Sequence, residues 1–124
     1  MTPIIRPATP DVVVVVILVE ILITEDCPNE DAAINLVGMA AEYVGVAPRL
    51  QLTEVADLDQ AERQRFMGSP TIRVNGRDIA PAAEGQQEVS LACRLYASTD
   101  GLSGVPELTL IRVALEKAHA AEGS

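Results

Sequence analysis

The sequence has 124 residues, a length that suits one domain with a modest core. Hydrophobic residues make up 48% and aromatic residues only 2%, so aliphatic side chains have to build that core. The net charge of −9 and the lack of aromatic stacking platforms argue against a nucleic-acid partner, because a phosphate backbone would be repelled. Two cysteines are too few for a disulfide scaffold and favour a reducing, cytoplasmic setting. We therefore expect a single domain over residues 1–124.

The first third of the chain contains a long aliphatic run. Residues 1–10 hold three prolines and are expected to form a loose leader. Residues 12–23 are mostly β-branched, which is typical of a strand buried on both faces of a sheet. Glu20 interrupts the run, no small-x-small cleavage site follows it, and the run is too short to span a bilayer. The sequence therefore predicts neither a signal peptide nor a membrane association.

An amphipathic helix is expected after this strand. Pro28 suits the first turn of a helix, and Glu30 and Asp31 place acids near its positive dipole end. Apolar residues then recur at helical spacing until Gly45, which predicts the end of the helix.

The middle of the chain alternates strands with a short helix. Residues 48–55 partly alternate polar and apolar side chains, which indicates a second strand. Residues 57–65 are expected to form a helix capped by Asp57. A strand over residues 71–74 should turn back through Asn75-Gly76 into residues 77–79, because this dipeptide favours a hairpin.

The last part is predicted to be irregular before a closing helix. Residues 80–104 are rich in turn-forming residues and are interpreted as a loop-rich insertion, with a short helix over residues 89–96. Residues 106–120 have the apolar spacing of a helix. The expected order is β-α-β-α-β-β-α, an α/β fold with a mixed four-stranded sheet flanked by helices and its first two strands parallel.

Cys27 stands at the turn between the first strand and the first helix. The macrodipole and free N–H groups at a helix N-terminus favour a thiolate, so we predict that Cys27 is reactive. Cys93 is flanked by aliphatic residues, and free cysteine is among the most buried residue types, so its position favours a place in the core over a catalytic role. Glu30 is expected to be a solvated acid of the first helical turn.

Two stretches of the chain resemble the thioredoxin-like superfamily. They are Thr-Glu-Asp-Cys-Pro-Asn-Glu at residues 24–30 and Gly-Ser-Pro-Thr at residues 68–71, the latter followed by Ile-Arg-Val-Asn-Gly-Arg. The resemblance implies a three-layer sandwich in which Pro70 follows a cis peptide bond and packs against the reactive thiol. It also implies that Ser69, Pro70 and Thr71 contact the substrate. It covers roughly residues 12–79 and the last helix, and leaves residues 80–104 outside.

The chain departs from the thioredoxin pattern three residues after Cys27. The second motif cysteine is replaced by Glu30, so a dithiol cycle within the motif is not available. Either a low-molecular-weight thiol such as glutathione or Cys93, 66 residues further along, would have to resolve a mixed disulfide. The expected partner is a thiol or disulfide substrate, either a protein or a small molecule.

A second resemblance suggests different chemistry. Together with Ala-Cys-Arg-Leu-Tyr at residues 92–96, the Gly-Ser-Pro-Thr stretch is similar to a group of small bacterial thioredoxin-like proteins, some of which are labelled as resembling alkylmercury lyases. Under this alternative, Cys27 and Cys93 would bind mercury and Glu30 would hold the proton. A third hypothesis is a thioredoxin-fold binding module without catalysis. The sequence contains no phosphate-binding glycine loop and no paired metal-binding motif, so it predicts no cofactor and no resident metal. It does not predict the oligomeric state.

Overall fold

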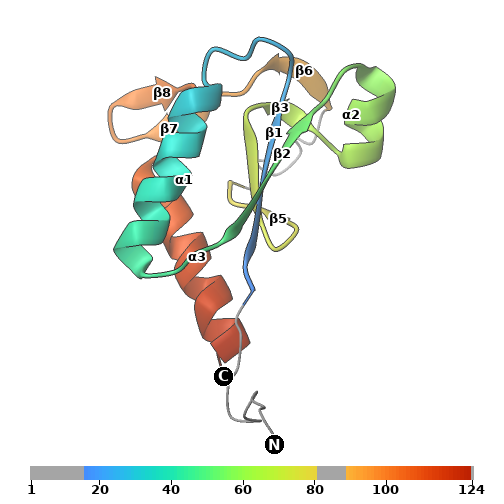
Figure 1. Cartoon of the computed structure of the whole chain (residues 1–124). Helices are drawn as coiled ribbons and strands as arrows, with labels where there is room; N and C mark the ends of the chain where they lie inside the picture. Colours follow the sequence, from blue (N-terminus) through green and yellow to red (C-terminus); the bar gives the residue numbers. More distant parts are fainter. Residues whose placement is uncertain (1–15, 81–88, 124) are drawn as a thin grey trace, which may run out of the picture.

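The computed structural model describes residues 16–80 and 89–123 and has an α/β architecture (Figure 1). A mixed sheet of four strands has the order β2-β1-β4-β5. These strands are β1 (Leu18–Ile23), β2 (Arg49–Glu54), β4 (Thr71–Val74) and β5 (Arg77–Asp78). β1 pairs in parallel with β2 and antiparallel with β4, and β4 continues antiparallel into β5. The predicted mixed sheet, with its first two strands parallel, is confirmed.

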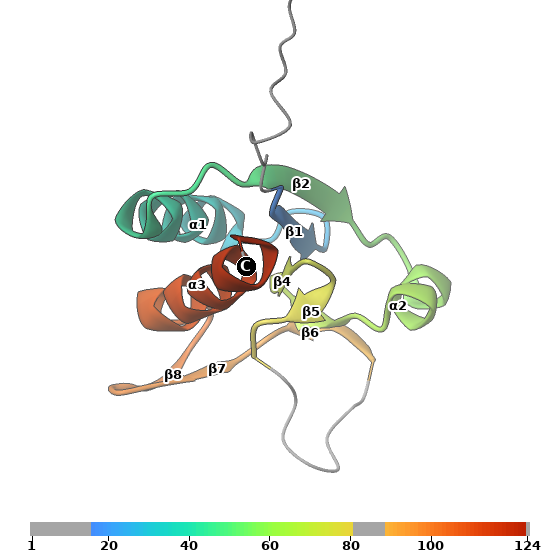
Figure 2. The same cartoon turned by 90° about the horizontal axis from the view of Figure 1, so that it is seen from below.

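Helices lie on both sides of this sheet. α1 (Glu30–Val44) and α3 (Leu108–Gly123) lie together on one side, and α2 (Leu58–Gln64) lies on the other, as the view in Figure 2 shows. Within the described residues these are the three helices of the fold. The observed order contains the predicted β-α-β-α-β-β-α series, with further short strands added to it.

The central strand β1 carries apolar side chains toward both layers. Val19 and Ile21 are fully buried in the cluster formed with α1 and α3, whereas Leu22 is fully buried in a second cluster on the side of α2. That second cluster also contains Val55 and Phe66. A strand covered on both faces needs nearly continuous aliphatic sequence, which explains the pattern in residues 18–23. Residues 1–15, which include the expected leader and the start of the predicted strand, lie outside the described residues.

The ends of the helices follow local chemistry. α1 begins at Glu30 after Asn29, whose side chain makes no capping hydrogen bond. It ends at Val44 and is capped by Gly45 in the left-handed conformation (φ 84°). α2 has the predicted cap, because Asp57 accepts a hydrogen bond of 2.9 Å from the backbone N–H of Gln60. Pro28 was expected in the first turn of α1, but it precedes the helix.

Three strands within the predicted loop-rich insertion, and a fourth that precedes it, correct the prediction for this part of the chain. β3 (Met67–Ser69) pairs in parallel with β6 (Ser90–Cys93), and β7 (Tyr96–Ser98) forms a hairpin with β8 (Gly101–Ser103). The helix predicted over residues 89–96 is therefore wrong. The backbone of this segment pairs with β3 instead, through hydrogen bonds from Ser90 N–H to the Phe66 carbonyl (3.0 Å) and from Arg94 N–H to the Ser69 carbonyl (2.9 Å). The remaining insertion residues 81–88 lie outside the described part.

None of the helices in residues 16–80 and 89–123 is long and apolar enough to cross a membrane.

The central position of β1 yields a stability prediction. Ile21→Ala should lower the free energy of unfolding by about 2–5 kcal/mol, because it removes buried methyl and methylene groups from the cluster under α1 and α3. Val16→Ala is the matched control, since Val16 is more than half exposed and its truncation should change stability by less than ~0.5 kcal/mol. Urea unfolding followed by circular dichroism measures both changes. Equal effects of the two substitutions would contradict the central role of β1.

Candidate functional site

Cys27 lies in the turn between β1 and α1. Its backbone N–H donates to the Thr24 carbonyl (3.3 Å), and its own carbonyl accepts from Glu30 N–H (3.3 Å). Asp26 adopts a left-handed conformation (φ 57°), which reverses the chain just before the cysteine. Cys27 is only 8% exposed and belongs to the core cluster under α1 and α3. The thiol is therefore at the predicted strand-to-helix turn, but it faces the protein interior.

The Ser69-Pro70-Thr71 segment is buried and joins β3 to β4. The Ser69–Pro70 peptide bond is cis, as the thioredoxin resemblance implied. The Ser69 hydroxyl oxygen accepts a hydrogen bond of 3.0 Å from Thr24 N–H, so this segment contacts the turn that carries Cys27. The Thr71 hydroxyl donates back to the Gly68 carbonyl (2.7 Å), which satisfies a buried polar group within the same loop.

Cys93 lies at the end of β6 and is exposed. Its aliphatic neighbours predicted a place in the core, and this prediction is wrong. β6 pairs only with the short strand β3 among the described strands, so side chains of β6 that do not face the core meet solvent. Cys93 is the β-pairing partner of Ser69. Both cysteines are free thiols.

Ser69 is thus the residue that connects the two cysteine-bearing segments. Its side chain binds the Cys27 turn, and its backbone pairs with β6 at Cys93. The two thiols are 66 residues apart in sequence, yet they belong to segments that contact the same buried serine.

A buried arginine, Arg94, stabilises the Ser69-Pro70-Thr71 segment. The Arg94 side chain is 9% exposed and forms an ion pair of 2.7 Å with Asp78, whose side chain is 15% exposed. The same guanidinium donates to the Thr71 hydroxyl (3.3 Å) and to the Ala80 carbonyl. A guanidinium removed from water needs such a set of acceptors, because an unpaired buried charge is strongly destabilising. Arg94 therefore ties β6 to both ends of the β4–β5 hairpin.

Tyr96 completes the support. Its ring lies under the Arg94 guanidinium, with 4.8 Å between the guanidinium carbon and the ring centroid, and its hydroxyl donates to the Pro70 carbonyl. Burial raises the pKa of the Tyr96 hydroxyl, an effect that the nearby Arg94 charge only partly offsets. The tyrosine is thus held protonated as a donor to the loop that carries Pro70.

Two glycines allow the close approaches on which this arrangement depends. Gly68 has φ 122°, and a Cβ atom there would lie 3.0 Å from Arg94 Cβ. A Cβ atom at Gly104 would lie 2.5 Å from Asn29 Nδ2, so the chain between β8 and α3 packs directly against the residue that precedes α1. Two segments of the predicted insertion therefore contact the surroundings of Cys27 and Pro70.

The structure does not assemble the predicted mercury-binding set. Glu30 is half-buried at the first position of α1. Within residues 16–80 and 89–123, no group of three or more His, Cys, Asp or Glu side chains is arranged to hold a metal ion. Cys27, Glu30 and Cys93 are therefore not brought together as metal ligands.

Sequence reasoning did not single out Asp78, Arg94 or Tyr96 as part of the site. Arg94 and Tyr96 occur in the Ala-Cys-Arg-Leu-Tyr stretch, which carried one of the resemblances, but an arginine normally indicates a solvated surface because it is rarely buried unless it is paired. Tyr96 is one of only three aromatic residues, which was the available signal that it has a structural role.

Comparisons of the chain with protein-family models, with curated proteins and with solved structures found no match. The interpretation of the site therefore rests on its own geometry.

The Arg94–Asp78 pair predicts a large effect of a single substitution. Asp78→Ala should lower the free energy of unfolding by about 3 kcal/mol, because it leaves the Arg94 charge buried without its carboxylate. Asp100→Ala removes an exposed carboxylate from the β7–β8 hairpin and should change stability by less than ~0.5 kcal/mol. Chemical denaturation measures both variants. Similar values for the two would show that the ion pair does not support the fold.

The raised pKa of Tyr96 predicts a loss of stability at alkaline pH. The unfolded chain releases the tyrosine proton near pH ~10, whereas the folded protein retains it at that pH. The stabilisation that comes from the raised pKa of Tyr96 is fully present below the pKa of this tyrosine in the unfolded chain. It is lost as the pH rises from that value through the pKa of Tyr96 in the folded protein. The free energy of unfolding should therefore fall more steeply above about pH 10 in the wild type than in Tyr96→Phe.

The matched control is Tyr43→Phe, because Tyr43 is 66% exposed. Urea unfolding at a series of alkaline pH values, with tyrosinate absorbance as a second readout, gives the slopes. In Tyr43→Phe, the free energy of unfolding should fall with pH as steeply as in the wild type. An equally steep fall in Tyr96→Phe would contradict the prediction.

Proposed function

We propose that this chain has a thioredoxin-like fold and carries out thiol–disulfide exchange at a site formed by Cys27, Cys93 and the Ser69–Thr71 segment. The sheet order supports the fold, since a parallel β1-α1-β2 unit is followed by the antiparallel pair β4–β5 and by α3, as the resemblance implies. The strands β3 and β6–β8 are additions to this arrangement.

The observation that carries the proposal is the position of Ser69 between the two thiol-bearing segments. The Thr24 N–H bond to its hydroxyl holds the Cys27 turn, and β-pairing with Cys93 holds β6. A site with two cysteines compensates for Glu30, which occupies the place of the second motif thiol. The second thiol needed for a complete dithiol cycle is then supplied by Cys93 of β6.

The exposures of the two cysteines support different roles for them. Cys93 is exposed, so its thiolate attacks a substrate disulfide RS–SR′, a mixed disulfide forms on Cys93, and RS⁻ leaves. The buried Cys27 thiolate then attacks Cys93 Sγ, which forms a Cys27–Cys93 disulfide and releases R′S⁻. The substrate is reduced to two thiols and the protein dithiol is oxidised to a disulfide.

The second step requires the two segments to approach each other. A disulfide needs Cα atoms within about 7 Å, so the Cys27 turn has to expose its thiol toward β6. Because two cysteines are too few for a disulfide scaffold, we place the cycle in a reducing compartment such as the cytoplasm.

Single-cysteine variants test this assignment. Reduced protein is treated with glutathione disulfide as the probe, and its mass is followed over time. The wild type should form an intramolecular disulfide without retaining glutathione, and Cys27→Ser should accumulate a stable mixed disulfide at Cys93. Cys93→Ser should react at least ~10-fold more slowly, because its remaining thiol is buried.

Serine is a close steric match for cysteine, so the variants serve as controls for each other once their unfolding curves agree. Equal rates for Cys93→Ser and the wild type would contradict the role of Cys93. Absence of any reaction in the wild type would favour the non-catalytic binding module.

A further inference from the structure

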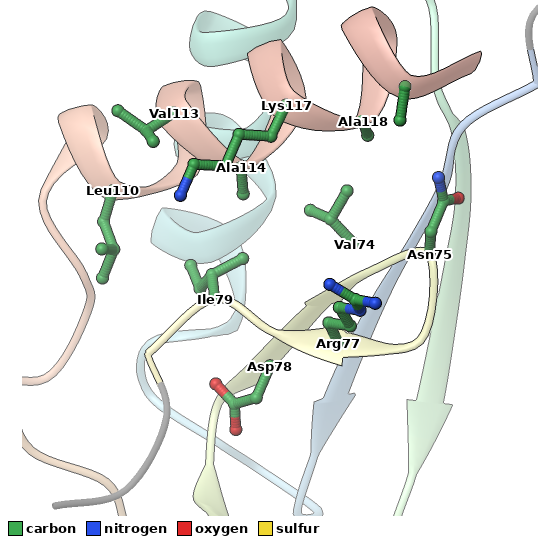
Figure 3. Close-up of a pocket in the computed structure, with 11 residues that line it drawn as sticks. Val74, Asn75, Arg77, Asp78, Ile79, Leu110, Val113, Ala114, Lys117 and Ala118 are labelled. Atoms are coloured by element: carbon green, nitrogen blue, oxygen red, sulfur yellow. The ribbon is translucent and has the colours of Figure 1, made fainter.

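A pocket lies on the α3 side of the β4–β5 hairpin, and neither cysteine lines it (Figure 3). Its volume is about 520 Å³, within the range of roughly 300–1,000 Å³ that is usual for small-molecule sites. The floor is apolar and is formed by Val74 and Ile79 from the hairpin side and by Leu110, Ala114 and Ala118 from α3. An apolar floor between two rigid elements favours a hydrophobic ligand body.

Two cations from different elements enter this pocket. Arg77 from β5 and Lys117 from α3 both line it, and their side chains extend into the space between the hairpin and the helix (Figure 3). The chain has only nine basic residues against eighteen acidic ones, so two cations over one apolar floor form a local exception to its net charge.

Among the residues that the structure describes, no acidic side chain pairs with either of these two cations. Asp78 also lines the pocket, but its carboxylate binds Arg94 at 2.7 Å. Within the described residues, no carboxylate oxygen lies within 4.0 Å of the charged nitrogens of Arg77 or Lys117. The pocket therefore offers two positive charges that a ligand can match.

We propose that this pocket binds a linear amphipathic carboxylate, such as a medium-chain fatty acid. The carboxylate lies between Arg77 and Lys117, since guanidinium groups bind carboxylates with two parallel hydrogen bonds. The alkyl chain lies along the floor on α3, where Leu110 to Ala118 span about 12 Å of helix. A floor of this length matches a saturated alkyl tail of medium length.

The proposal is tested by titrating the full chain with decanoate, below its micelle concentration, in a calorimeter. One saturable site per chain is expected, with weaker binding of 1-decanol, which has the same tail without the charge, and of decyltrimethylammonium, which has the opposite charge. Arg77→Gln and Lys117→Gln should each weaken decanoate binding by about 2- to 5-fold, as expected for exposed ion pairs. Arg63→Gln on α2, outside the pocket, should leave the affinity unchanged.

A pocket-filling variant tests the apolar part separately. Ala118→Leu places a larger side chain on the floor and should abolish decanoate binding while leaving thermal unfolding of the free protein unchanged within a few degrees. Equal affinities for decanoate and 1-decanol, or unaltered binding in the Arg77→Gln and Lys117→Gln variants, would overturn the proposal. A concentration-dependent dimer that excludes decanoate would also overturn it, since a second copy would then cover the pocket.

Discussion

The arrangement around the candidate site depends on the burial of one charge. The Arg94 guanidinium is almost entirely removed from water, and such a charge is tolerated only where acceptors surround it. Asp78, the Thr71 hydroxyl and the Ala80 carbonyl provide those acceptors. They come from β4, from β5 and from residue 80, just after β5. The hydrogen bonds that the Arg94 side chain needs therefore determine how β6 packs against the β4–β5 hairpin.

The same interaction explains why a segment with weak sequence signals has a defined position. The backbone of Arg94 binds the Ser69 carbonyl while its side chain binds Asp78, and Tyr96 reaches the Pro70 carbonyl two residues later. Cys93 is the neighbour of Arg94 in sequence. Its place opposite Ser69 is therefore a consequence of a polar network and not of hydrophobic packing around the thiol.

Much of the sheet could be predicted because its signals are local. The aliphatic run of β1, the Asn75-Gly76 turn and the Asp57 cap each act within a few residues, and all three are present in the structure. The short strand β6 could not be predicted in the same way. Residues 90–93 owe their form to pairing with distant β3 and to the contacts of the next residue, Arg94, which no local periodicity reveals, whereas β7 and β8 pair only with each other.

The sequence neighbours of the two cysteines do not indicate their environments, for a related reason. Polar residues precede Cys27, but the left-handed Asp26 turns the chain so that the thiol joins the core. The aliphatic neighbours of Cys93 suggested burial, but β6 is a short strand at the border of its sheet and leaves Leu95 and Cys93 in solvent. The polarity of the residues next to a cysteine indicates whether its thiol is buried only where the pairing of its segment is also known.

The pairing of β6 with β3 has a consequence for what can approach Cys93. An open strand edge accepts an extended peptide by adding it as a further strand, with main-chain hydrogen bonds that do not depend on the peptide's sequence. Beside Ser69 that edge is already occupied, because the Ser69 carbonyl accepts from Arg94 N–H. A molecule that reaches Cys93 on this side meets side chains of β6 rather than free backbone groups of β3. Under the proposed exchange function, substrates that approach from this side are selected by shape and side-chain chemistry.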